Sequence, residues 1–471
     1  MSTEGDPAAE AAAYQRCVAT SLALGRAGGL RLQPEIFWLP VSENCNLRCI
    51  GCDDVVTGFR KAYISPDEAR RLLTAGAGDA SFAEIDLTSG EPLLHPQLAE
   101  LIDICHALHP EARVSVVTNG TVPVRGKYRE AYARLDSIGL SIDGATAEVF
   151  EAIRVGASFP RFVQTVQDLV ALRRETGRPA QIQLCFTACA LNLHQLADVV
   201  RLGHAWGVDS VYAQTMEMNI APIQQAIGHL HLDRMDPAER SRLVDEAQAV
   251  AAALGIELSA SEGLYPLPPA PLPGPSAAFE ARAASLGVGV TRRNADGQPL
   301  LAATHVRQCQ YPWTQAPGIR KTAAGDWQLT VCCYMTEAGN RLVQDRYALG
   351  GAAEHGMLDL FNGPGYWQLR EDLAAGLTRE VCGDCAAALT HPPSLLQHLG
   401  WRLEALAREH GLPFPGGEAL RHLLQQSGIG PAQARRVRKA LREEWLTRFD
   451  TPPEWLQAVM QSTSELLAPG D

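Results

Sequence analysis

Residues 36–52 read IFWLPVSENCNLRCIGC, an apolar run followed closely by three cysteines in the spacing CxxxCxxC. The apolar run predicts a short buried strand, so Cys45, Cys49 and Cys52 fall on the loop after it. A structural zinc site or a fully ligated iron–sulfur cluster takes four protein ligands. Three thiolates instead suit a [4Fe–4S] cluster with one open iron, where an amino and a carboxylate group can chelate. The alternative is a zinc site that recruits a fourth ligand from elsewhere, such as His95.

Short apolar runs alternate with helical stretches from about residue 36 to about residue 215. Consecutive strand–helix–strand units predict one parallel sheet in an α/β fold, either open or closed into a partial barrel. The clearest helix start is Ser65, because Pro66 suits the first turn and Glu68 completes a capping box. The predicted strands are Ile36–Val41, Ala83–Thr88, Arg113–Thr118, Ser137–Ile142, Gln181–Thr187 and Ser210–Gln214. The later predicted helices are Pro96–Leu108, Phe162–Glu175, Leu193–Trp206 and Asp236–Leu254.

The composition limits the class of protein. A chain of 471 residues corresponds to roughly three domains. Its net charge of −12 argues against nonspecific nucleic-acid binding, which needs basic patches. No stretch is apolar for long enough to predict a membrane span, and residues 1–29 lack the pattern of a secretion signal. We therefore expect a cytoplasmic protein in which cysteines stay reduced and serve as metal ligands or nucleophiles.

Further polar segments follow the next three predicted strands. The segment 88–93 reads TSGEPL, residues 118–120 read TNG, residues 141–144 read SIDG, and Arg154 follows within IRVG. In order, and together with the cysteine loop, these segments resemble the motifs of the radical S-adenosylmethionine (SAM) superfamily. The GGEP motif of that family is similar to residues 89–92, with Ser89 in place of its first glycine. The SAM-binding residues that the resemblance implies are Ser89, Gly90, Glu91, Asn119, Ser141, Asp143 and Arg154, with Glu91 and nearby backbone groups at the SAM α-amino group.

The resemblance also implies a fold and a chemistry. The fold is a partial (β/α)6 barrel over residues 36–216, with a SAM-binding [4Fe–4S] cluster on the three cysteines. One-electron reduction of that cluster, by a flavodoxin- or ferredoxin-type donor, cleaves SAM to a 5′-deoxyadenosyl radical that abstracts a substrate hydrogen. We expect a small biosynthetic metabolite as substrate, with oxidation, epimerisation or rearrangement as the outcome. The alternatives are a peptide-modifying enzyme that forms a cross-link or an epimer, and a non-catalytic iron–sulfur or zinc scaffold.

A second set of cysteines lies toward the C-terminus, at Cys309, Cys332, Cys333, Cys382 and Cys385. This set resembles the SPASM/Twitch domain that carries an auxiliary cluster in many radical SAM enzymes. The resemblance implies a short β-hairpin plus a helix, and one fully ligated [4Fe–4S] cluster held by Cys309, Cys332 or Cys333, Cys382 and Cys385. Electron relay is the expected role of that cluster, and a four-cysteine zinc site is the alternative.

Catalytic groups besides the cofactors are harder to select. Cys185 and Cys189 flank the end of the fifth predicted strand, where a thiol can return a hydrogen atom to a product radical. The alternative for both is the common role of cysteine as a small buried apolar side chain. Glu217 follows the sixth strand and is either a substrate-contacting acid or base or a solvated loop carboxylate. The expected organisation is an N-terminal extension (1–35), the SAM core (36–216), a helix and proline-rich connection (217–305), the auxiliary-cluster domain (306–386) and a helical tail (387–471).

Overall fold

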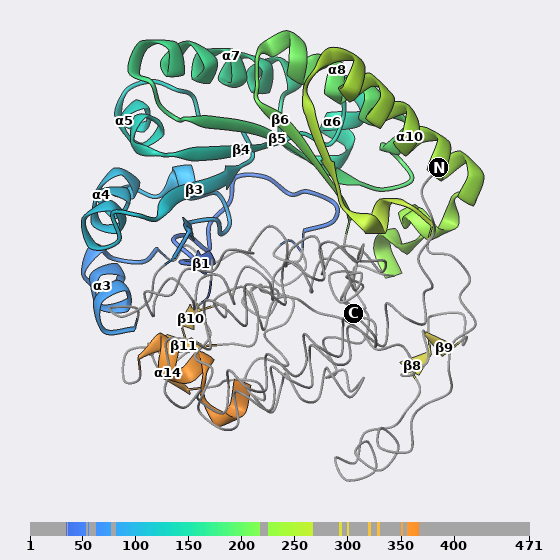
Figure 1. Ribbon diagram of the computed structural model, residues 1–471. Helices are drawn as coiled ribbons and strands as arrows, with labels where there is room; N and C mark the ends of the chain where they lie inside the picture. Colours follow the sequence, from blue (N-terminus) through green and yellow to red (C-terminus); the bar gives the residue numbers. More distant parts are fainter. Residues whose placement is uncertain are drawn as a thin grey trace, which may run out of the picture.

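Seven parallel strands form one sheet in the order β1-β2-β3-β4-β5-β6-β7 (Figure 1). The computed structural model describes residues 34, 36–52, 55, 63–76, 82–216, 225–266, 292–293, 299–300, 319–321, 327–329, 350–351 and 356–366. The strands are β1 Ile36–Trp38, β2 Glu84–Asp86, β3 Arg113–Thr118, β4 Ser137–Ser141, β5 Gln181–Ala188, β6 Ser210–Thr215 and β7 Glu257–Ala260. Within these ranges β1 and β7 are the two edges, so the sheet is open and not a closed ring.

The six predicted strands are all present, and β7 is an addition to them. Its sequence, Glu-Leu-Ser-Ala, is short and only partly buried, so it lacks the apolar run by which buried strands are recognised. The first strand ends three residues earlier than predicted. Pro40 explains this end, because proline has no backbone N–H to donate to the ladder.

Helices cross from each strand to the next and cover one face of the sheet (Figure 1). The predicted capping box is confirmed, because the Ser65 hydroxyl accepts the Glu68 N–H and the Glu68 carboxylate accepts the Ser65 N–H. Short α5 and α6 were not predicted, since each spans only about two turns of mixed polarity. The helices are α3 Pro66–Arg71, α4 Leu98–Leu108, α5 Lys127–Arg134, α6 Ala147–Ile153, α7 Phe159–Thr176, α8 Leu196–Trp206 and α10 Pro237–Leu254, with a π-helical turn η1 at Leu72–Gly76 and 3₁₀ turns η2 Pro92–Leu94 and η3 Leu193–Gln195.

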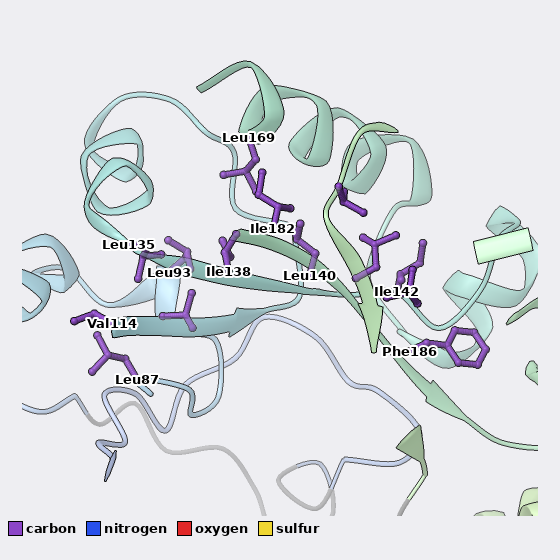
Figure 2. Close-up of a cluster of buried hydrophobic side chains, with 14 of the residues drawn as sticks. Leu87, Leu93, Val114, Leu135, Ile138, Leu140, Ile142, Leu169, Ile182 and Phe186 are labelled. Atoms are coloured by element: carbon purple, nitrogen blue, oxygen red, sulfur yellow. The ribbon is translucent and has the colours of Figure 1, made fainter. Parts of the chain in front are cut away.

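The main core lies between the sheet and these helices (Figure 2). Alternate residues of β4, Ile138 and Leu140, face the helical layer and are fully buried there with Leu169 of α7. The residues between them face the opposite side of the sheet, since successive strand side chains alternate. That side is lined mainly by small and polar residues in register, and we call it the polar face. Its members include Asp86, Ser115, Ser137, Gly139, Ser141, Cys185 and Tyr212.

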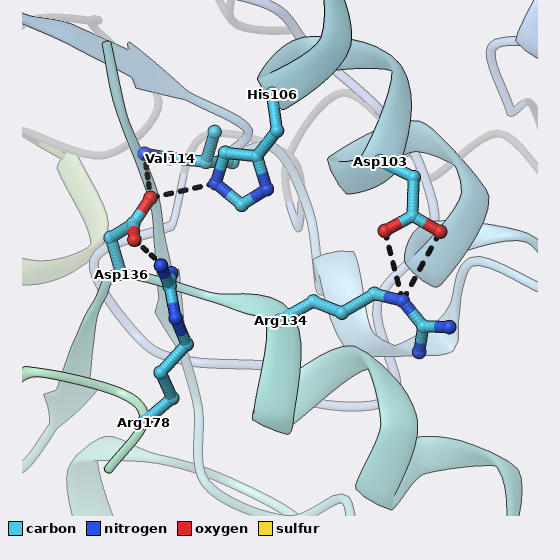
Figure 3. A network of polar contacts seen from close by, with 6 residues as sticks. All are labelled: Asp103, His106, Val114, Arg134, Asp136 and Arg178. Carbon is cyan, nitrogen blue, oxygen red and sulfur yellow. Dashed lines mark hydrogen bonds and ion pairs between the residues drawn. The ribbon is translucent and has the colours of Figure 1, made fainter. Parts of the chain in front are cut away.

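A half-buried carboxylate fastens the amino ends of the central strands (Figure 3). Asp136 accepts hydrogen bonds from the Val114 N–H at 2.9 Å and from His106 at 2.8 Å, and it pairs with Arg178. Burial alone would raise the pKa of Asp136, but these three partners hold it below its usual value. The network lies at the opposite end of the strands from the loops that carry the predicted motifs, so its role is structural.

Short elements of the predicted auxiliary-cluster region are also described. Strand β10 (Ile319–Lys321) pairs antiparallel with β11 (Trp327–Leu329), and β11 pairs with β12 (Gly350–Gly351). Helix α14 (Met357–Phe361) contributes three buried side chains to the main core. A second short pair joins β8 (Arg292–Arg293) and β9 (Pro299–Leu300). Cys309, Cys332, Cys333, Cys382, Cys385, Glu217 and residues 367–471 lie outside the described residues, so the domain boundaries stay predictions. No helix in the described part of the chain is long and apolar enough to cross a membrane.

The buried Asp86 of the polar face is expected to make the stability of the protein depend on pH. Burial raises the pKa of Asp86 from 3.8 to about 7, against the opposing hydrogen bonds from Thr88. The folded protein therefore retains a proton that the unfolded chain has lost between these pH values. Stability from this group is complete below the unfolded pKa, and it is lost as the pH rises toward 7, by up to about 1.4 kcal/mol per pH unit.

We predict that Asp86→Asn flattens this part of the stability profile. Chemical denaturation between pH 4 and 8 should show the free energy of unfolding falling less steeply in the variant than in the wild type. The matched control is Asp67→Asn on exposed α3, which should leave the wild-type slope. Equal slopes for wild type and Asp86→Asn would show that Asp86 does not titrate as described.

Candidate active site

The three cysteines lie on the loop that leaves the carboxyl end of β1, and each is half-buried and outside any disulfide. The Cys45 sulfur accepts the Leu47 N–H at 3.5 Å and the Asn119 side-chain amide at 3.7 Å. The Cys49 sulfur lies 4.0 Å from a guanidinium nitrogen of Arg154. Burial raises the pKa of both thiols, while these donors favour the thiolate. The donors thus oppose the cost of forming the thiolates that a metal requires.

Glu91 joins the exits of β2 and β3 to the cysteine loop. Its carboxylate is fully buried and accepts three hydrogen bonds, from Thr118 Oγ1 at 2.7 Å, the Asn119 N–H at 2.8 Å and the Leu93 N–H at 3.1 Å. Its own N–H donates to the Asn44 carbonyl at 2.8 Å. Burial raises the pKa of Glu91 and the three donors oppose that rise. The side chain predicted to bind the SAM amino group is therefore held in place by three protein donors.

The two residues before Glu91 seat this segment on the cysteine loop. The Ser89 hydroxyl donates to the Ser42 carbonyl at 2.6 Å. Gly90 has φ +54°, and a Cβ there would lie 2.5 Å from the Asn44 carbonyl oxygen, so only glycine fits. Asn119 completes the junction, since its side-chain amide also donates to Asn46 Oδ1 at 2.9 Å. The segments that carry Ser89, Gly90 and Asn119 are therefore in direct contact with the loop around the first cysteine.

A buried ion pair lies at the second cysteine. Arg154 Nε is 2.8 Å from Asp143 Oδ2, with the two side chains 12% and 4% exposed. Asp143 Oδ1 also accepts the Thr187 N–H at 2.8 Å. Burial raises the pKa of Asp143, and Arg154 opposes that rise. Ser141, two residues earlier, is buried at the end of β4. Arg154 therefore connects Asp143, at the exit of β4, with the Cys49 thiol.

The two candidate hydrogen-donor cysteines have different surroundings. Cys185 lies on the polar face between Ser141 and Tyr212 in register, and its burial raises its pKa to about 12. A Cβ on Gly139 would come within 2.8 Å of the Cys185 sulfur, so the thiol covers that glycine. Cys189 is fully buried in a small apolar cluster with Ile153, Met216 and Ile227. Both are neutral thiols, as hydrogen-atom donors must be, and only Cys185 borders the polar face.

The zinc alternative with His95 does not match the structure. His95 Nε2 contacts the Ile64 carbonyl at 2.8 Å, and Nδ1 accepts the Gln97 N–H at 3.0 Å. Both ring nitrogens therefore have protein partners. Across the described residues, no three His, Cys, Asp or Glu side chains converge closely enough to hold a single metal ion. The ligands of an iron–sulfur cluster do not need to converge on one point, because each thiolate binds a different iron.

Two features of the site were not found from the sequence. Asp86 is two residues upstream of the TSGEPL segment, yet only the register of β2 shows that it faces the polar side. Met216 directly follows β6 and contacts Gly51 of the cysteine loop. No local sequence signal pairs residues 51 and 216, because their contact depends on the whole sheet.

Comparisons with known proteins agree with this geometry. Residues 39–178 match the family model of the radical SAM superfamily. A GTP 3′,8-cyclase of Streptomyces coelicolor is 27% identical over 175 residues, covering 36% of this chain and 49% of that protein. A GTP 3′,8-cyclase of Chlorobaculum tepidum is 32% identical over 135 residues, covering 28% of this chain and 40% of that protein. The chain thus spans half or less of the length of these curated relatives, and they indicate an enzyme.

The fold is shared with solved structures. Streptococcus suis SuiB bound to S-adenosylmethionine is 14% identical, with a TM-score of 0.51 over 78% of this chain and 75% of SuiB. SuiB bound to the precursor peptide SuiA gives a TM-score of 0.50 over 75% of this chain and 70% of SuiB. At this identity the likeness concerns the fold alone. At residues 39–178 the chain therefore contains a domain that matches the radical SAM superfamily.

Proposed function

We propose that this protein binds a [4Fe–4S] cluster on Cys45, Cys49 and Cys52 and SAM beside it, and that it removes a hydrogen atom from a small biosynthetic metabolite. The observation that carries the proposal is the junction of the three-thiol loop with Glu91, Asn119 and the Asp143–Arg154 pair. When bound, the cluster supplies the electron that cleaves SAM to the 5′-deoxyadenosyl radical. Oxidation, epimerisation and rearrangement are all compatible outcomes.

The residues present fit the two cofactors. Three thiols on one loop leave one iron of a [4Fe–4S] cluster without a protein ligand, which is where an amino acid group can chelate. The donor set around the sulfurs consists of a backbone N–H, the Asn119 amide and the Arg154 guanidinium. Hydrogen bonds of this kind stabilise the negative charge of thiolate ligands. Gly90 keeps the backbone at the exit of β2 free of a side chain.

Each polar residue of the site then has a defined task. Glu91 positions the β2 and β3 exits through the three protein donors to its buried carboxylate, and it stays the proposed partner of the SAM amino group. Ser89, Gly90, Asn119 and Ser141 line the approach where SAM would bind, mainly through backbone and amide groups. Arg154 holds a positive charge between Asp143 and Cys49. Cys185, on the polar face, is the candidate for returning a hydrogen atom to a product radical, and Glu217 stays a candidate acid or base.

The described charged groups of the polar face give no specific support for a substrate with a phosphate chain. In the described part of this face Arg113 pairs with Glu84, and Arg154 pairs with Asp143. Asp86 adds a further buried carboxyl whose interactions are with Thr88. A triphosphate carries several negative charges and needs cationic or metal partners in a buried site. GTP, which names the curated relatives, is therefore not carried over to this chain.

Peptide modification is the second candidate, because SuiB, which shares the fold, has been solved with a precursor peptide. A non-catalytic scaffold is disfavoured by the connected Glu91, Asn119 and Asp143, which such a protein would not need.

We further propose an auxiliary [4Fe–4S] cluster on Cys309, Cys332 or Cys333, Cys382 and Cys385, which relays electrons, and a flavodoxin- or ferredoxin-type electron donor. A cytoplasmic location accords with reduced thiols.

The first test is SAM cleavage. Anaerobically reconstituted protein should bind about eight irons per chain, four for each cluster, and form 5′-deoxyadenosine from SAM with dithionite. Cys49→Ala should abolish 5′-deoxyadenosine formation, since it removes one of the three iron ligands. The matched control Cys105→Ala changes a buried cysteine of α4 and should keep full activity. Protein that binds zinc only, or Cys49→Ala protein that still cleaves SAM, would contradict the proposal.

The auxiliary cluster has a separate test. Cys382→Ala combined with Cys385→Ala should reduce the iron content by about half, because one of two four-iron clusters is lost. The remaining iron should still support 5′-deoxyadenosine formation under dithionite, because the SAM-binding ligands are intact. Unchanged iron content would show that these cysteines do not bind a cluster, and a four-cysteine zinc site would appear as stoichiometric zinc in the wild type.

A further inference from the structure

Gly51 lies between the second and third cysteines of the loop, and its missing side chain leaves room for Met216, which directly follows β6. A Cβ on Gly51 would lie 2.7 Å from the Met216 sulfur, 3.0 Å from its Cγ and 3.4 Å from its Cε. The first of these separations is shorter than real Cβ contacts allow. The Met216 thioether therefore rests directly on the Gly51 backbone, and a side chain at position 51 would require the methionine to shift.

Met216 is itself firmly held. It follows the end of β6, is 4% exposed, and its N–H donates to the Ala188 carbonyl at 2.7 Å. Its side chain belongs to an apolar cluster that is separate from the main core. The buried members are Ile153, Cys189, Met216 and Ile227, with Ile50, Val149 and Leu230 packed against them. This cluster includes Ile50 of the cysteine loop, so it forms an apolar support beneath Cys49 and Cys52.

The backbone of the cysteine loop is fastened to the same support. The Ile50 N–H donates to the Ile153 carbonyl at 3.0 Å, and the Arg48 N–H donates to the Val155 carbonyl at 2.9 Å. The segment that receives these bonds also carries Arg154, whose guanidinium reaches Cys49. The loop is thus held on one side by hydrogen bonds and on another by the methionine, and both attachments meet at the residues between Cys49 and Cys52.

We propose that Met216 is a positioning residue that fixes the Cys49–Cys52 turn for the cluster, through its contact with Gly51. The inference rests on the proposed function, since the cluster itself is part of that proposal. Methionine suits the task because its unbranched thioether fills an irregular gap against a bare backbone. An apolar support also limits the access of water to the adjacent cluster, and solvent exposure is one of the factors that set cluster potentials.

The experiment is a double-mutant cycle with Gly51→Ala, Met216→Ala and the combined variant. After anaerobic reconstitution, the readouts are the paramagnetic resonance signal of the reduced SAM-binding cluster, its change on adding SAM, and its midpoint potential. Gly51→Ala should lower the SAM-sensitive signal to about half or less, because the added methyl overpacks the turn. The combined variant should regain most of it, because alanine at 216 makes room. Met216→Ala alone should keep the signal with a shifted midpoint potential.

The matched control is Gly203→Ala, which crowds Leu184 and Val208 from helix α8 and should leave the cluster signal unchanged. Full signal in Gly51→Ala, failure of the combined variant to regain it, or an unshifted potential in Met216→Ala would overturn the proposed role. If Gly51→Ala does not fold, the midpoint potential of the cluster in Met216→Ala tests the proposed role of Met216 alone. Wild-type protein without a SAM-sensitive signal would refute the proposed function instead, so the two failures are distinguishable.

Discussion

The fully buried carboxylate of Glu91 is the constraint on which the rest of the site depends. Three donors from the exits of β2 and β3 converge on its two oxygens, and its backbone N–H binds the loop that leaves β1. A buried carboxylate costs free energy unless its oxygens are satisfied, so the three segments hold one another in place. Asn119 extends this arrangement to the Cys45 sulfur. The position of Cys45 therefore depends on the hydrogen bonds of Glu91 and Asn119 at the carboxyl ends of the strands.

A second carboxylate performs the equivalent task at the other side of the loop. Asp143 binds the exit of β5 through the Thr187 N–H and holds Arg154 beside Cys49. The main helix-facing core is built from apolar side chains, while the Asp143–Arg154 pair and the Glu91 carboxylate lie at the carboxyl ends of the strands. Parallel α/β sheets bind ligands at this edge because consecutive strand exits meet there. Met216 supports the same loop from an apolar side.

The sequence predicted those parts of the fold that are encoded locally. The strands from residues 36 to 215 were found from short apolar runs, and the Ser65–Glu68 capping box from its spacing. Strand β7 was missed because an edge strand of sequence ELSA is too short and polar to be recognised. In the site, the motif residues were identified but their partners were not. Glu91 stays the predicted partner of the SAM amino group, and its contacts with Thr118 and Asn119 result from strand register, which no local pattern contains.

Electron–nuclear double resonance on the reduced protein with isotopically labelled SAM tests the central claim most directly. The account predicts that ¹⁵N in the SAM amino group couples to the electron spin of the cluster on Cys45, Cys49 and Cys52, because its open iron accepts that group. The coupling should persist when Cys382 and Cys385 are both replaced by alanine. A reduced cluster that shows no coupling to labelled SAM would contradict an open iron at this loop, and with it the assignment of the three thiols.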